Sequence, residues 1–127
     1  MLALPKLLRL QAVFAAMAIG FLIASGIRAS WVGAPLSAAD VPSSITLFVR
    51  YSACLFLPRY GEIGWYRIAM IPALVAFGGG GVIGNVVNFS QNGLASYASL
   101  PVFFVAIAIN AFGSVLNIAA ALGLFRK

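Results

Sequence analysis

Four long apolar stretches, separated by short polar segments, dominate the pattern of hydrophobic and polar positions in this chain. A helix needs about 20 consecutive apolar residues to cross the hydrocarbon core of a bilayer. The stretches at about 7–29, 65–89 and 100–125 are each long enough to do so with some tilt. The pattern therefore predicts an all-α fold, an integral membrane bundle of four transmembrane helices that forms a single domain over residues 1–127.

The first and second stretches each carry an alternative. Lys6 and Arg9 precede the first stretch as in a secretory signal, but we expect this segment to be retained as a transmembrane helix. The second stretch, about 42–57, would rise only ~24 Å and carries Arg50 near its middle. It is either a short spanning helix or a re-entrant segment, and the charge distribution favours a spanning helix.

Basic residues lie almost entirely on one side of the predicted bundle. Cytoplasmic loops of membrane proteins carry an excess of Lys and Arg, which predicts that both termini are cytoplasmic, in a bacterial-type inner membrane. Arg28 alone falls on the opposite side. The cytoplasmic set would be Lys6, Arg9, Arg59, Arg67, Arg126 and Lys127.

Small residues recur at helical spacing in three of the four stretches. In lipid, small residues let helix backbones approach closely enough for packing and interhelical hydrogen bonds. We expect these stripes to pack helices together, with the alternative that one stripe faces outward and docks onto another protein. The helix-packing candidates are Ala12, Ala16, Gly20, Ala24, Ala76, Gly80, Gly84, Asn110, Gly113 and Asn117.

Two further features of the third and fourth stretches attract interest. The run Gly78–Gly81 is costly within a helix, since each glycine disfavours it by up to ~1 kcal/mol relative to alanine. It predicts either close packing with a soft point in the helix, or a site where a ligand, a lipid tail or another helix touches the backbone. The carboxamides of Asn85, Asn88, Asn110 and Asn117 are expected to fix helix register, or alternatively to line a narrow polar path.

Arg50 is the strongest single candidate for a functional residue, because an arginine within a membrane span costs free energy and usually has a role. Either it reaches the membrane surface along its own side chain, or it pairs with the Asn110 and Asn117 carboxamides, with a lipid phosphate or with a carboxylate of another subunit. Aromatic rings at helix ends are typical of the membrane interface. The predicted lipid- or partner-binding residues are Arg50, Arg59, Arg67, Trp65 and Tyr66.

The amino-acid composition limits the kinds of catalytic and metal-binding site that the chain can form. The chain has 8% charged residues against about 25% in an ordinary soluble domain, no histidine, and only two acidic residues. This inventory predicts no metal site, no cofactor and no enzymatic activity. The basic residues are scattered singly, which argues against nucleic acid as a partner. Cys54 has no second cysteine to pair with and is expected to be a small core residue.

Two classes of function are compatible with these features. The first is a non-catalytic accessory or stabilising subunit of a larger membrane complex, which packs through small-residue helix faces and contacts membrane lipids. The alternative is a small homo-oligomeric transporter, channel or lipid-handling protein, in which Arg50 and the asparagines of the fourth helix face an anionic head group or solute. Expected partners are membrane lipids, including anionic head groups, and other membrane subunits or further copies of the chain.

Overall fold

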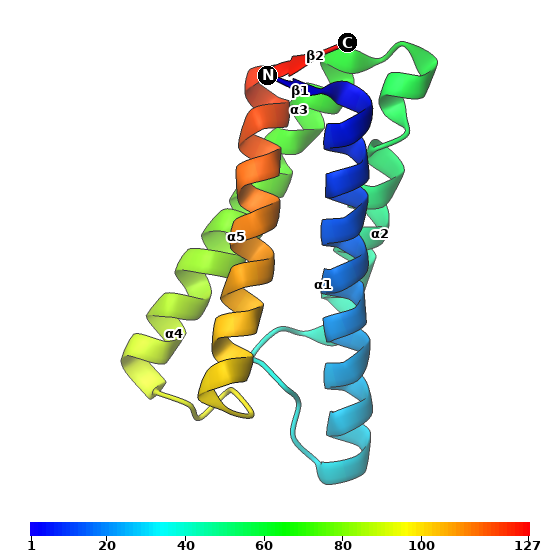
Figure 1. The fold of residues 1–127 in the computed structure, drawn as a ribbon. Helices are drawn as coiled ribbons and strands as arrows, with labels where there is room; N and C mark the ends of the chain where they lie inside the picture. Colours follow the sequence, from blue (N-terminus) through cyan, green and yellow to red (C-terminus); the bar gives the residue numbers. More distant parts are fainter.

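The computed structural model describes the whole chain, Met1–Lys127, as a bundle of helices (Figure 1). The elements in chain order are α1 Leu4–Val32, α2 Val41–Cys54, a short 3₁₀-helix Leu57–Tyr60, α3 Ile63–Leu74, a π-helix Val75–Gly84, α4 Asn85–Asn92 and α5 Leu100–Leu122. They form four helical rods long and apolar enough to cross a membrane: Leu4–Val32, Val41–Tyr60, Ile63–Asn92 and Leu100–Leu122. The predicted all-helical class and its four apolar helices are confirmed.

The second rod is longer than the sequence pattern indicated. The 3₁₀-helix Leu57–Tyr60 continues the chain beyond α2, so that the rod reaches 20 residues, Val41–Tyr60. Pro58 fits the first turn of this short helix, where a missing N–H costs nothing. Gly61 then ends it in the left-handed conformation, at φ 77°. The rod is therefore long enough and apolar enough to cross a membrane.

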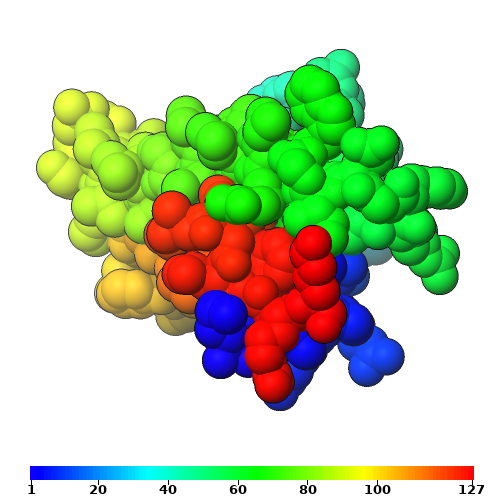
Figure 2. Space-filling model, turned by 90° about the horizontal axis from the view of Figure 1, so that it is seen from above, coloured from blue at the N-terminus to red at the C-terminus, as the bar shows by residue number.

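Both ends of the chain meet at one end of the bundle, here called the terminal end; the opposite end is the loop end. Leu2–Ala3 (β1) pairs in parallel with Phe125–Arg126 (β2), and the blue and red residues lie against each other in Figure 2. The prediction that the last helix continues to residue 125 is wrong: it ends at Leu122. Gly123 adopts the left-handed conformation at φ 72°, which directs the chain toward β1.

Prolines and capping side chains define where the helices begin. Asp40 precedes α2, and its Oδ2 accepts hydrogen bonds from the Ser43 backbone N–H at 3.2 Å and the Ser43 hydroxyl at 2.5 Å. The side-chain hydrogen bond and the backbone hydrogen bond from Ser43 lower the pKa of Asp40. Ser99 caps α5 in the same way through Val102 N–H. Each of these helices has a proline in its first turn, where it is well tolerated.

The core of the bundle is built around α5, which packs against α1, α3 and the π-helix, while α2 packs against α1. Four aromatic rings fill the space between α1, α2 and the π-helix. Phe14 meets Phe48, Tyr51 and Phe77 edge to face, at centroid distances of 5.5, 5.6 and 5.3 Å. Gly113 of α5 lies directly against the Phe14 ring, and a Cβ atom at this position would overlap it. The absence of a side chain at residue 113 is thus what lets α1 and α5 approach.

Candidate functional site

A buried polar cluster joins all four rods between the aromatic core and the terminal end. Gln11 Nε2 donates hydrogen bonds to Asn117 Oδ1 at 3.1 Å and to Met70 Sδ at 3.2 Å. Tyr51 Oη donates to the same Asn117 oxygen at 2.6 Å, and Tyr66 Oη donates to Gln11 Oε1. Because these side chains largely satisfy one another, the cluster is a structural connection between helices rather than an open binding site.

This cluster corrects the prediction that Tyr66 contacts lipid or a partner at the membrane interface. Tyr66 is fully buried, whereas its neighbour Trp65 is 64% exposed. The two residues differ in which side of α3 they occupy, which their position near a helix end does not reveal. Gln11 was missed altogether, although a lone glutamine in an apolar stretch signals that a buried partner is needed.

A cavity of about 400 Å³ lies toward the loop end, on the other side of the aromatic core. Such a volume is within the range of small-molecule sites, which is roughly 300–1,000 Å³. All four rods contribute to its walls: the first through α1, the second through α2, the third through the π-helix and α4, and the fourth through α5. Its polar lining consists of Ser37, Ser44, Asn85, Asn88 and Asn110, and its apolar lining includes Leu22, Phe48, Phe77 and Ile109.

The carboxamides in this cavity leave hydrogen-bond acceptors without a partner. Asn88 Oδ1 is buried and accepts no hydrogen bond from the chain. Asn110 donates Nδ2 to the Ala106 carbonyl at 2.9 Å, while no donor of the chain reaches its oxygen. Asn85 differs, since its oxygen accepts from Tyr97 Oη at 2.6 Å. Asn88 Oδ1 is enclosed by the chain, whereas Asn110 is only partly buried, so the cavity suits an occupant that donates a hydrogen bond to the Asn110 oxygen.

Tyr97 lies in the loop between α4 and α5 and contacts Asn85 of the cavity lining. Its ring is buried and packs edge to face on Phe103, at a centroid distance of 5.0 Å. Burial raises the pKa of Tyr97, so the hydroxyl keeps the proton that it donates to Asn85 throughout the neutral pH range. The sequence does not predict the contact of Tyr97 with α4.

The glycine run forms part of the cavity wall. Gly78–Gly81 lies within the π-helix Val75–Gly84, a wide helical form that is rare and often found at functional sites. Gly81 is packed against the Asn110 side chain, and a Cβ atom there would overlap it. Gly80 and Gly84 also line the cavity, whereas Gly79 does not. Gly81 therefore fits the predicted role of close packing, and Gly80 and Gly84 fit the predicted role of giving an occupant access to the backbone.

Arg50 is not part of this cavity. It is exposed on α2, where it borders a shallow depression with Ser43, Thr46 and Leu47. It takes part in none of the side-chain hydrogen bonds within the chain, and Asn117 belongs to the buried polar cluster instead. The site expected from Arg50 together with Asn110 and Asn117 is therefore not assembled.

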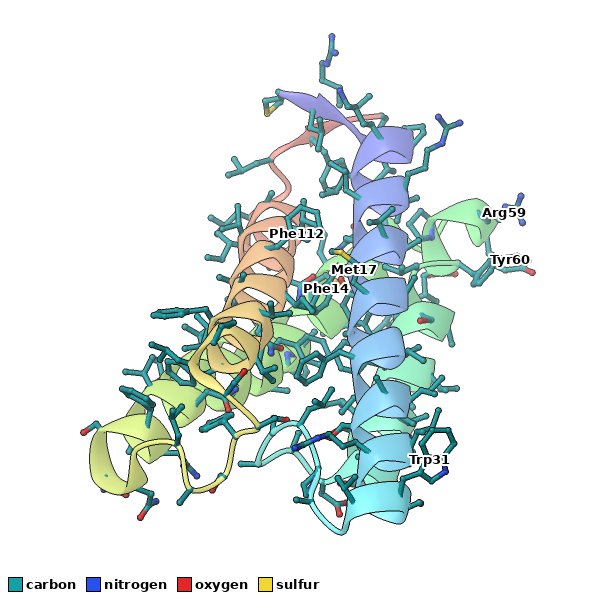
Figure 3. All side chains as sticks on the ribbon, turned by 60° about the horizontal axis from the view of Figure 1, so that its bottom comes forward. Phe14, Met17, Trp31, Arg59, Tyr60 and Phe112 are labelled. Atoms are coloured by element: carbon teal, nitrogen blue, oxygen red, sulfur yellow. The ribbon has the colours of Figure 1, made fainter.

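The remaining predicted binding residues lie at the terminal end, and Arg67 and Arg59 make different contacts there. Arg67 Nε donates to the Ala121 carbonyl at 3.1 Å, and its guanidinium lies beside Gly123, so it stabilises the end of α5. Arg59 is exposed, lies 5.9 Å from the centre of the Phe56 ring, and projects away from the bundle beside Tyr60 (Figure 3).

The small-residue stripes divide into inward and outward sets. Gly113 lies at a helix contact, and Ala76 borders the core and the loop-end cavity. The stripe of α1 is different, because its members are exposed and Gly20 has no neighbouring atoms within 4 Å of a Cβ position. The expectation that these residues pack helices within the chain is therefore wrong for six of them: Ala12, Ala16, Gly20 and Ala24 of α1, and the exposed Gly80 and Gly84.

The polar groups of the loop-end cavity are all uncharged. Its walls contain hydroxyl and carboxamide groups but no acidic, basic or thiol side chain. No group of three or more His, Cys, Asp or Glu side chains is placed to hold a metal ion. The chain matches no known family model, no curated protein and no solved structure.

Proposed function

We propose that this chain is a non-catalytic, lipid-handling membrane protein, in which the loop-end cavity holds the uncharged polar part of an amphipathic membrane molecule. The observation that carries this proposal is the unpartnered carboxamide oxygen of Asn110 in a largely apolar cavity whose other polar groups are uncharged. A hydroxyl or amide N–H group of a lipid would satisfy it. A charged head group would find no counter-charge among the cavity's side chains.

The distribution of basic residues gives the proposed orientation. Placing the terminal end in the cytoplasm of a bacterial-type inner membrane satisfies the excess of Lys and Arg at that end. The loop-end cavity would then lie in the outer half of the bilayer. An occupant would enter it from the outer leaflet, with its apolar part against Leu22, Phe48 and Phe77.

A second candidate is the accessory subunit of a larger membrane complex. One observation favours it: the side chains of the α1 stripe Ala12, Ala16, Gly20 and Ala24 are exposed. A helix of another protein approaches closely where side chains are small. This function needs no occupant in the cavity.

The two candidates are distinguished by native mass spectrometry of the protein, extracted with its surrounding lipid from its own host membrane. Lipid handling predicts about one tightly retained molecule per chain, uncharged and bearing a hydroxyl or amide group, whether the chain is recovered as a monomer or as a homo-oligomer. Recovery at fixed stoichiometry with unrelated subunits, and without such a molecule, would contradict lipid handling and establish the accessory role.

A further inference from the structure

A second groove, separate from the loop-end cavity, lies between α1 and the end of the second rod. It has a volume of about 460 Å³ and lies toward the terminal end. Its floor is formed by small residues of α1, and its opposite wall by Leu55 and Phe56. Its lining includes Arg9, Ala12, Ala16, Ile19, Phe56 and Arg59.

The charged groups of this groove lack a counter-ion within the chain. Arg9 and Arg59 are both exposed and belong to its lining, and neither takes part in a side-chain hydrogen bond. The only acidic side chain at this end is Glu62, which is not among the lining residues. Two guanidinium groups at one groove bind a phosphate well, because each presents several N–H donors in a fixed planar arrangement.

Apart from Ser52, the remainder of the groove is apolar, and its length suits a lipid chain. From Leu8 to Ile19, the first and last groove residues of α1, the helix rises ~16.5 Å. One leaflet of the hydrocarbon core is about 15 Å thick, half of the whole. Ala12 and Ala16 leave room along this length, while Ile19 and Phe56 supply apolar contact.

From this charge complementarity and shape, we infer that the groove between α1 and the second rod binds an anionic phospholipid. Arg9 and Arg59, both exposed at the edge of the groove, turn toward the phosphate when the lipid binds, and one acyl chain lies over Ala12 and Ala16. The site is independent of the proposed function, because none of the residues lining the loop-end cavity contributes to it.

The test uses the full chain in nanodiscs that contain phosphatidylglycerol or phosphatidylcholine, with retained lipid counted by native mass spectrometry. Wild-type protein is expected to retain phosphatidylglycerol preferentially. The double variant Arg9→Gln/Arg59→Gln should bind it about tenfold more weakly or worse, since charge-assisted hydrogen bonds are lost. The control Arg126→Gln/Lys127→Gln removes the same charge at the same end and should bind as wild type does.

A second pair of variants tests the acyl-chain contact. Ala16→Leu fills the groove and should reduce phosphatidylglycerol retention, while Ala24→Leu, on the same exposed stripe but outside the groove, should not. Inorganic phosphate should not displace the lipid. Equal retention of the two phospholipids, equal loss in the charge control, or displacement by phosphate would overturn the inference. So would an Ala16→Leu variant that loses a protein partner while keeping its lipid.

Discussion

Replacing Gly113 by alanine is expected to destabilise the bundle by about 1–3 kcal/mol, the usual cost of overpacking a core. A loss of stability is informative, because alanine normally favours a helix over glycine by up to about 1 kcal/mol. The Phe14 ring occupies the space that a Cβ atom needs, and Phe48, Tyr51 and Phe77 surround that ring. These neighbouring rings limit how far the Phe14 ring can move. Reversible unfolding in mixed micelles measures the change.

Two further variants show whether the Phe14 contact is the cause. Gly20→Ala lies in the middle of α1 with open space around it and should be neutral or slightly stabilising. Phe14→Leu should make Gly113→Ala less harmful, because the two residues share one contact, and their coupling is expected to be about 0.5–3 kcal/mol. Additive losses in the double variant would show that the contact does not limit the approach of α1 and α5.

Replacing Gln11 by leucine is expected to cost about 1–3 kcal/mol, the penalty for a buried polar group without a partner. The change removes the acceptor of Tyr66 Oη, and Tyr66 is fully buried. It also removes the hydrogen bond from Gln11 Nε2 to Asn117 Oδ1, although that oxygen keeps its bond from Tyr51. The same unfolding measurement applies, with the exposed Gln91→Leu as the matched control.

A second substitution separates the effect of the lost Tyr66–Gln11 hydrogen bond from the effect of changed packing at residue 11. In the Gln11→Leu background, Tyr66→Phe removes the unpaired hydroxyl and should restore much of the stability. In the wild-type background the same change should lower it. If Tyr66→Phe lowers stability equally in both backgrounds, the Tyr66 hydroxyl is not paired with Gln11 in the folded protein.

The number of helices followed from the sequence because bilayer thickness sets the length of apolar stretch that a span needs. Helix ends were less certain. The second stretch appeared short because the 3₁₀-helix Leu57–Tyr60 carries Pro58 and Arg59, which interrupt the apolar pattern. The strand pair of Leu2–Ala3 with Phe125–Arg126 has two residues on each side and leaves no periodicity that could be recognised.

Which helix face points inward could not be predicted, and this limited the candidate site most. In a membrane protein the outward face is apolar as well, so hydropathy does not distinguish it from the core. Gly113 and Gly20 are both glycines within long apolar helices, yet Gly113 is buried and Gly20 is exposed. Arg50 and Asn110 are both unusual residues for a span, but their places on α2 and α5 keep them apart.

The central claim is that the loop-end cavity binds an uncharged lipid through hydrogen bonds, and adjacent glycines provide its most direct test. Gly79 and Gly80 both have open space around a Cβ position, but only Gly80 lines the cavity. Both substitutions remove a glycine from the same helix, so their effects on helix propensity match.

The measurement is the binding of dioleoylglycerol, which carries one free hydroxyl, to the wild type, Gly80→Leu and Gly79→Leu in nanodiscs. The same lipid with its hydroxyl methylated serves as the comparison ligand. We expect wild type and Gly79→Leu to bind the free alcohol alike and the methylated form about tenfold more weakly, with binding lost in Gly80→Leu. Equal binding by all three proteins, or no preference for the free hydroxyl, would contradict the claim.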